Sequence, residues 1–229
     1  MLFGEKEVRE NIRNREGKRV FYLGKGDQLT SGARDYLTGQ RIEILPADQA
    51  KAERYALLGG GYLEEKPEHM THLNGEVLVS KLHPRIGFRG AVDTLESEIL
   101  LAQTQLPDEL SADLQEILDL ARLTIRCDVL EEPLNRDTLC GLTESQQRQH
   151  SHWPQEFYGQ PHFMPSKADG AQIAWLNRVR CSARAAELKA VAAFTDENGS
   201  PTRPDILRAM NRLSSMVYIL MIRMKAGRK

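Results

Sequence analysis

Three charged side chains lie in one long helical pattern of the chain at spacings of four and three residues: Arg180, Arg184 and Glu187. Because an α-helix has 3.6 residues per turn, all three would share one face. Two guanidinium groups on that face would suit an anion such as phosphate, which the forked geometry of arginine binds well. A solvated ladder of opposite charges, which adds little stability, explains the same spacing equally well.

Polar residues also interrupt two other segments whose apolar residues recur at helical spacing. Asp93 stands among apolar neighbours, and a carboxylate buried there would need a cation. Arg180 is a candidate for that cation, although spacing alone cannot pair the two. Asn211 and Arg212 interrupt the last apolar stripe, and asparagine is a weak helix former. A hydrogen bond from Asn211 to a neighbouring backbone group is the simplest explanation for its position.

Cysteine and histidine give little support for a metal site. The three cysteines, Cys127, Cys140 and Cys181, are odd in number and have no CxxC spacing, which favours free thiols over disulfides or zinc. His69 and His72 are spaced like some metal ligands, but the sequence offers no obvious third ligand. We therefore expect no metal bound by protein side chains alone.

Composition restricts the kinds of partner. The chain has 229 residues and a net charge of −1, with a pI near 6.6, so we expect neither nucleic acid nor a membrane surface as a partner. The sequence has no long uncharged apolar stretch that could span a bilayer. Its first residues are charged and lack the apolar segment of a signal peptide, so we expect a cytoplasmic protein.

Apolar stripes with helical spacing predict a mainly α protein, a bundle of four or five helices. The four long helices are expected over residues 86–105, 108–129, 169–194 and 203–224, and a short one near residues 143–150. Residues 18–46 alternate like a small strand, helix and strand unit. We therefore expect an N-terminal α+β appendage at residues 1–46, a linker at residues 47–69 and a helical domain at residues 70–229.

Three segments in order resemble the motifs of the ATP-dependent cobalamin adenosyltransferases of the helical-bundle type, most closely their ethanolamine-utilisation branch. The family patterns are Arg-Val-x-x-x-Gly-x-x-Asp-Glu-Leu-Asn, Ala-Arg-x-x-x-Arg-Arg-Ala-Glu and Leu-Asn-Arg-Leu-Ser-Asp. The matching segments are residues 81–97, 176–188 and 207–215. The resemblance extends over about residues 27–222.

The resemblance implies a reaction and its ligands. Reduced cobalt of cobalamin would attack the 5′ carbon of ATP, bound with Mg²⁺, and triphosphate would leave, giving adenosylcobalamin for ethanolamine degradation. Such enzymes are usually homotrimers with active sites between subunits. A reductase and ethanolamine ammonia-lyase are the implied partners, and a bacterial microcompartment is an implied place of association.

The resemblance also assigns roles to residues at the matching motif positions. Asp93 would pair with Arg180 and hold the cleft, as the catalytic pair. Arg184 would contact the phosphates, and Glu187 and Asn211 would lie near the nucleotide.

Other positions complete the expected site. Lys81, Arg85 and Arg89 are further candidates for phosphate binding. Phe163 is the nearest candidate for the apolar residue that covers the lower face of cobalamin, with ordinary loop packing as the alternative.

The sequence departs from the resembled branch in two places. Many members carry a histidine and a cysteine cluster that bind a transition metal, but residues 52–68 contain neither residue type, so we expect no such metal. Ala185 stands where the family has the second arginine of a pair. A non-catalytic carrier of cobalamin or nucleotide, or a scaffold that docks through residues 1–46, is therefore an alternative to the enzyme.

Overall fold

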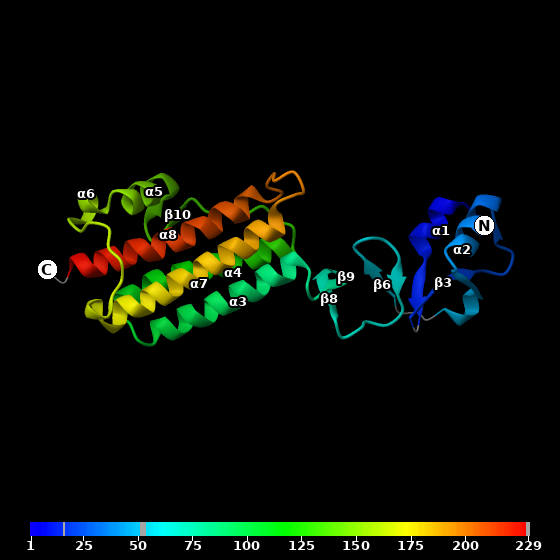
Figure 1. Cartoon of the computed structure of the whole chain (residues 1–229), viewed down its shortest axis with the longest axis horizontal. Helices are drawn as coiled ribbons and strands as arrows, with labels where there is room; N and C mark the ends of the chain where they lie inside the picture. Colours follow the sequence, from blue (N-terminus) through cyan, green and yellow to red (C-terminus); the bar gives the residue numbers. More distant parts are fainter. Residues whose placement is uncertain (16, 51–53, 228–229) are drawn as a thin grey trace. The chain divides into compact units, whose positions relative to one another are not determined.

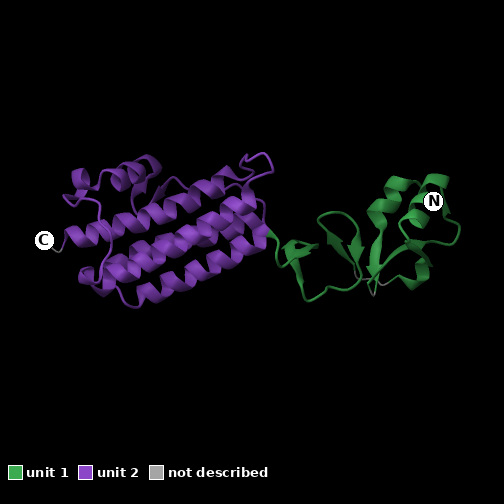
Figure 2. Ribbon diagram, viewed as in Figure 1, with its two compact units in different colours: residues 1–83 green, residues 84–229 purple. Residues whose placement is uncertain are grey.

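The protein is described by a computed structural model that covers residues 1–15, 17–50 and 54–227. The chain divides into two compact units, residues 1–83 and residues 84–229 (Figure 2). Each unit has its own cluster of buried apolar side chains. The two units are therefore described one after the other.

Four long helices build unit 2 and lie alongside one another (Figure 1). They are α3 (Pro84–Gln103), α4 (Asp108–Val129), α7 (Gly170–Phe194) and α8 (Pro204–Ala226). Helices α7 and α4 each pack against both α3 and α8, so the four helices enclose one core. The predicted mainly α bundle with an N-terminal α+β part is confirmed, and each long helix begins within two residues of its expected start.

The apolar stripes read from the sequence form this core. Leu95 and Ile99 of α3, Ile117 of α4, Leu176 of α7 and Leu213 of α8 are each at most 1% exposed. Removing each such side chain from water contributes about 1.5–3 kcal/mol. Proline stands at the start of three of these helices: Pro84 begins α3, Pro107 precedes α4 and Pro204 lies in the first turn of α8. Proline suits a first turn because it lacks the N–H that this turn leaves unpaired in any case.

The connection between α4 and α7 covers part of α8. It contains the two-residue strands β10 (Thr138–Leu139) and β11 (Leu142–Thr143), then α5 (Glu144–His152), α6 (Pro154–Tyr158) and the 3₁₀ turn η2 (Lys167–Asp169). Thr143 and Gln146 form a capping box that starts α5. Helix α5 packs against α8, which brings the end of α5 to the bundle surface.

Unit 1 is built around a seven-stranded sheet with the order β5-β3-β2-β7-β6-β9-β8. Figure 1 labels β3, β6, β8 and β9 of this sheet. Its strands are β2 (Arg13–Arg15), β3 (Lys18–Leu23), β5 (Glu43–Pro46), β6 (Tyr55–Leu57), β7 (Tyr62–Leu63), β8 (Met70–Asn74) and β9 (Val77–Ser80). The remaining elements are β1 (Leu2–Phe3), α1 (Glu5–Asn11), β4 (Gln28–Leu29), α2 (Ser31–Gly39) and the 3₁₀ turn η1 (Ala47–Gln49). The expected strand, helix and strand at residues 18–46 are β3, α2 and β5, and Thr30 caps α2 as predicted.

The unit boundary falls later than the sequence suggested. The expected linker, residues 47–69, contains β6 and β7, and the expected start of the helical domain, residues 70–83, forms a hairpin of unit 1. The physical reason is strand pairing: β6 pairs in parallel with β9, and β9 pairs with β8. Residues 51–53 of the expected linker lie outside the described residues.

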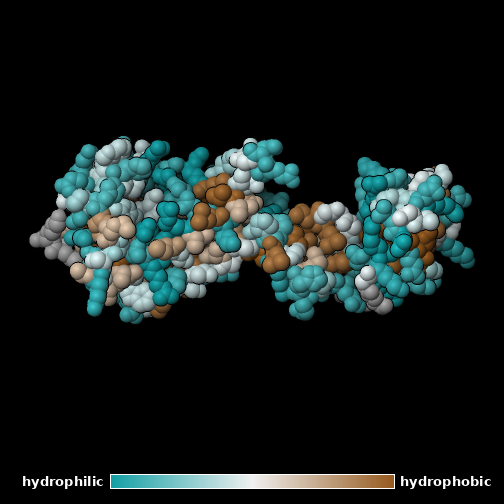
Figure 3. Space-filling model, in the orientation of Figure 1, coloured by the Kyte–Doolittle hydropathy of each residue, from teal (hydrophilic) through white to brown (hydrophobic). Residues whose placement is uncertain are grey.

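The surface of unit 2 is mixed. On the face seen in Figure 3, apolar areas lie among hydrophilic residues. Exposed apolar side chains of its helices include Leu100 and Leu101 of α3 and Leu188 and Val191 of α7. Across the described residues, every helix is too short or too polar to cross a lipid bilayer.

Candidate functional site

Two of the arginines expected in the site, Arg180 and Arg184, lie on α7 along the groove between α7 and α8. Arg180 is half-buried and Arg184 is exposed, one turn apart on α7. A cavity of about 170 Å³ lies beside them. It is lined by Ser151, Arg180, Arg184, Ser214, Ser215 and Tyr218. The arginine-bearing face of α7 therefore lies along a hollow rather than along a flat surface ladder.

The amide of Asn211 links α8 to α7 beside this cavity. Its Nδ2 donates to Glu187 Oε1 at 2.6 Å, and its Oδ1 accepts from Arg212 Nη2 at 2.6 Å. The sequence suggested a backbone partner for this side chain, but both contacts are to charged side chains. Hydrogen bonds with ionised partners are shorter and stronger than neutral ones. Glu187 and Asn211 thus form one polar network with the next residue on α8.

The expected pair of Asp93 and Arg180 is not formed within one chain. Arg180 donates instead from Nε and Nη2 to Asn177 Oδ1, at 3.1 and 2.9 Å. Asp93 is exposed on α3 and, among residues 1–15, 17–50 and 54–227, has no ion-pair partner. The reason is local geometry, because Asn177 lies one turn before Arg180 on the same helix, whereas Asp93 points to solvent.

Phe163 lies next to the same groove. It is half-buried, and its ring stacks against Tyr218 with centroids 6.4 Å apart and planes 25° apart. Lys225 Nζ lies 4.1 Å from the centroid of the Phe163 ring. His162 is hydrogen-bonded through Nδ1 to Tyr218 Oη at 2.9 Å. Tyr218 lines the cavity, so Phe163 stacks on one of its lining residues. We call Phe163 and Tyr218 the aromatic border of the groove; the spacing of Phe163 to Arg180 alone did not indicate this contact.

The lysine under this border is itself held in place. Lys225 Nζ lies 2.6 Å from Asp169 Oδ1. The ammonium group, together with Ser166, lowers the pKa of Asp169 to about 2. Asp169 is therefore ionised throughout the physiological range, and this ion pair holds Lys225 Nζ beside the Phe163 ring.

Arg85 and Arg89 form a second arginine cluster, at the start of α3. Arg85 Nε donates to Asp128 Oδ1 and Arg89 Nε donates to Asp128 Oδ2, each at 2.7 Å. Asp128 is fully buried near the end of α4, and Arg85 Nη2 also reaches its backbone oxygen. One carboxylate thus binds both of the arginines that we predicted as candidates for phosphate binding. The signal that could have found Asp128 is its place on the apolar stripe of α4, four residues after Thr124.

Lys81 lies in unit 1, where it is exposed directly after β9. It thus belongs to a different unit from the other expected site residues. His72, one of the two closely spaced histidines, bonds through Nδ1 to the backbone oxygen of Gly75 at 3.0 Å. In the described part of the chain, no group of three metal-ligating side chains lies close enough together to hold an ion.

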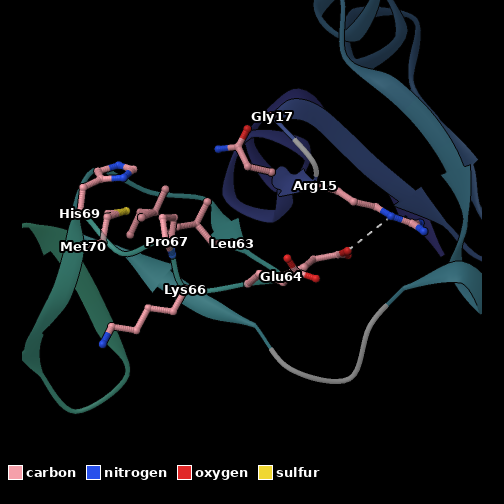
Figure 4. Close-up of a pocket in the computed structure, with 11 residues that line it drawn as sticks. Arg15, Gly17, Leu63, Glu64, Lys66, Pro67, His69 and Met70 are labelled. Carbon is pink, nitrogen blue, oxygen red and sulfur yellow. Dashed lines mark ion pairs between the residues drawn. The ribbon is translucent and has the colours of Figure 1, made fainter.

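Unit 1 has a cavity of its own, of about 470 Å³ (Figure 4). Its most notable lining residue is Glu64, whose side chain is 1% exposed and forms ion pairs with Arg13 and Arg15 at 3.4 and 4.0 Å. These two guanidinium groups compensate the buried carboxylate. In the described part of unit 1, the lining contains none of the residues that the sequence marked for nucleotide or cobalamin.

Comparison with known proteins gives one consistent family. Residues 61–224 match the cobalamin adenosyltransferase family. Corrinoid adenosyltransferases named EutT from Salmonella typhimurium strain LT2 and Escherichia coli strain K12 are each 35% identical to this chain over 158 residues. The match covers 69% of this chain and 59% of each relative, so the chain spans about three-fifths of the length of these curated relatives.

Solved structures share the fold of the bundle. Two variants of a PduO-type ATP:corrinoid adenosyltransferase from Lactobacillus reuteri, both complexed with cobalamin and ATP, superpose with TM-scores of 0.50 and 0.51. They are 21% and 22% identical, and each covers 70% of this chain and 90% or 87% of the solved chain. At this level of identity, the likeness concerns the fold.

Proposed function

Because the chain belongs to the cobalamin adenosyltransferase family, we propose that it transfers the 5′-deoxyadenosyl group of ATP to the cobalt of reduced cobalamin. The electron pair of the reduced cobalt forms the new bond to the 5′ carbon. The bond from that carbon to the phosphate oxygen breaks, and its electron pair leaves with the triphosphate. The product is adenosylcobalamin. This chemistry needs no nucleophilic side chain, so the protein contributes orientation, charge and exclusion of water.

The observation that carries the proposal is the groove between α7 and α8. Arg180 and Arg184 line its cavity, and Glu187 and Asn211, on the same two helices, bond to each other. The leaving triphosphate bears several negative charges, and fixed cations at its oxygens stabilise their build-up in the transition state. Arg184 is exposed beside the cavity and is the residue best placed to contact phosphate. Arg180, held by Asn177, would contribute charge from a fixed position.

The aromatic border suits the second substrate. A corrin ring is broad and largely apolar, and aromatic side chains offer flat surfaces of matching character. Phe163 and Tyr218 stack at the edge of the groove. We assign Phe163 to the lower face of cobalamin, where an apolar side chain would replace the lower ligand and make the cobalt easier to reduce.

Magnesium fits this site only as a companion of ATP. Mg²⁺ is commonly held by substrate phosphates, water and one or two carboxylates rather than by a dedicated cage. The described residues offer no close group of three acidic or histidine side chains, and the Glu187 carboxylate already accepts from Asn211. The ion would neutralise phosphate charge, and Arg180 and Arg184 would supply the remaining positive charge.

We further propose a homotrimer with its active sites between subunits. The outward faces of α3 and α7 carry exposed apolar side chains, among them Leu101 and Leu188. Asp93 is exposed on α3, where Arg180 of a second copy could reach it. If Asp93 and Arg180 pair between subunits, a single chain would lack the pair, as this structure does. Asp93 would then align the cleft through Arg180, as the motif positions imply.

The cellular setting is proposed from the likeness to the EutT relatives. Adenosylcobalamin made by this chain would serve ethanolamine degradation in the cytoplasm, in association with a bacterial microcompartment. A reductase would supply the electron for cobalt, and ethanolamine ammonia-lyase would receive the product. Lys81, Arg85 and Arg89 remain candidates for phosphate binding in the assembled trimer.

An anaerobic assay tests the proposed function. Purified protein is mixed with chemically reduced cobalamin, ATP and Mg²⁺, and the cob(I)alamin absorbance band is followed with time. We expect loss of the band that needs both protein and ATP. A transition-metal chelator, added with excess Mg²⁺, should leave the rate unchanged, because residues 52–68 lack histidine and cysteine. Saturable cobalamin binding without ATP-dependent loss of the band would instead favour the carrier.

A further inference from the structure

We propose that Arg212 is a positioning residue for the nucleotide, acting through the side-chain amide of Asn211. Arg212 orients this amide so that its second N–H donates to an acceptor atom of bound ATP. The inference rests on the proposed function and extends it to a residue outside the groove. Arg212 lines a different cavity, of about 400 Å³, which is bounded by α4, α5 and α8, whereas Asn211 contacts α7.

The orientation of the amide follows from the chemistry of its two neighbours. A guanidinium group can only donate hydrogen bonds, so Arg212 Nη2 must meet the amide oxygen of Asn211. An ionised carboxylate can only accept, so Glu187 Oε1 must meet the amide nitrogen. Both distances are 2.6 Å. The reversed amide would face donor with donor and acceptor with acceptor, so the two contacts together permit one orientation.

Within the described part of the chain, one N–H of this fixed amide is unused. The nitrogen of Asn211 carries two N–H bonds, and one of them is used by Glu187. The positive charge of Arg212 on the amide oxygen polarises the group and strengthens the other N–H as a donor. The site therefore recognises a hydrogen-bond acceptor, such as a ribose oxygen, a phosphate oxygen or a ring nitrogen of the nucleotide.

Arg212 is poorly explained as a purely structural residue. Within the residues that the structure describes, its Nε is buried without a hydrogen-bond partner. Most buried polar groups in native proteins are hydrogen-bonded, so an arginine kept for stability alone would be expected to satisfy its donors. The contact that Arg212 does make goes to the residue that faces the proposed nucleotide site.

Arg208 provides a matched control on the same helix. It lies one turn before Arg212 and lines the same cavity, but its nearest acidic partner is Glu144, at 3.8 Å. Arg208→Met therefore removes a guanidinium group from the same wall without touching Asn211. Arg212→Met has a similar length and removes the donor to the amide. Arg212→Lys retains charge and a donor but loses the planar fork.

The experiment is a double-mutant cycle read by calorimetric titration of the whole protein with ATP and Mg²⁺, without cobalamin. Arg212→Met should raise the Kd for ATP about tenfold, the usual scale for a hydrogen bond to a charged group. Asn211→Ala should raise it at least as much, and the double variant should be no weaker than Asn211→Ala alone. Arg212→Lys should recover part of the affinity, and Arg208→Met should bind like the wild type. In the assay, Arg212→Met should raise KM for ATP more than it lowers kcat.

The outcomes separate this inference from the function beneath it. Wild-type protein that binds no ATP would overturn the proposed function and this inference together. Normal binding by the wild type with additive losses in the double variant would overturn the inference alone, because Arg212 would then act independently of Asn211. If Arg212→Met does not fold, the same cycle is run with Arg212→Lys, and additivity carries the same meaning.

Discussion

The bundle holds two arginine clusters that look alike in the sequence but differ in their surroundings. Arg85 and Arg89 share the buried carboxylate of Asp128, at 2.7 Å each. Arg180 and Arg184 line an open groove, where Arg180 meets the neutral amide of Asn177. A carboxylate cancels much of the charge that an anion would seek, whereas an amide does not. We infer that the first cluster mainly holds helices together and that the second mainly serves a ligand.

The largest effect is expected when the closed cluster, formed by Arg85, Arg89 and Asp128, is broken. Asp128→Asn should lower the free energy of unfolding by about 3–5 kcal/mol, because it leaves two partly buried guanidinium groups without their carboxylate. Denaturant unfolding followed by circular dichroism measures the change. Asp119→Asn, on the exposed face of the same helix, should change stability by less than about 0.5 kcal/mol. Equal changes in the free energy of unfolding for the two variants would show that the closed cluster contributes no more to stability than an exposed carboxylate.

The open cluster, formed by Arg180 and Arg184, should affect activity rather than stability. Arg184→Ala should lower kcat for the proposed adenosyl transfer about a hundredfold, since it removes a cation from the site that we propose for the leaving phosphates. Its free energy of unfolding should stay within about 0.5 kcal/mol of the wild type, because the side chain is exposed. Arg178→Ala is the control, since Arg178 is also exposed on α7 but pairs with Glu98. A stable Arg184→Ala variant with wild-type turnover would remove Arg184 from the site.

Asp93 tests whether the open cluster is completed by a second copy. Asp93→Asn should lower turnover about tenfold and shift the oligomer toward smaller species, while the helical content is retained. Light scattering and the absorbance assay measure the two effects on the same sample. Asp119→Asn again serves as the control. A wild-type monomer at micromolar concentration with full activity would contradict the intersubunit site.

A smaller change in stability is expected when acid protonates Asp205, which lies at the start of α8. Arg203 is the main cause that lowers the pKa of Asp205 from 3.8 to about 2. Because the folded pKa lies below the unfolded one, this pair stabilises the protein above about pH 4, and the contribution is lost as the pH falls toward 2. The Asp205→Asn variant should therefore be less stable than the wild type at neutral pH. Its stability should also fall less steeply as the pH is lowered. Melting temperatures of both proteins between about pH 5 and pH 2 would show whether the curves converge.

Apolar spacing determined most of the bundle. The stripes that contain Leu95, Ile117 and Leu213 marked helices whose buried faces are those of the structure, because helix burial repeats every three to four residues. The boundary of unit 1 was harder to find. Strands β6 and β7 have only three and two residues, and they are stabilised by pairing with strands distant in sequence. The local sequence pattern does not predict such pairing.

The site divides in the same way. The sequence by itself indicated that Arg180, Arg184 and Glu187 share one helical face, since 3.6 residues per turn requires it. Only the tertiary structure decided which partners those residues meet: Asn211 for Glu187, Asn177 rather than Asp93 for Arg180, and Asp128 for Arg85 and Arg89. The physical reason is that helical periodicity fixes directions within one helix. The packing of one helix against another fixes which charged groups approach closely enough to bond.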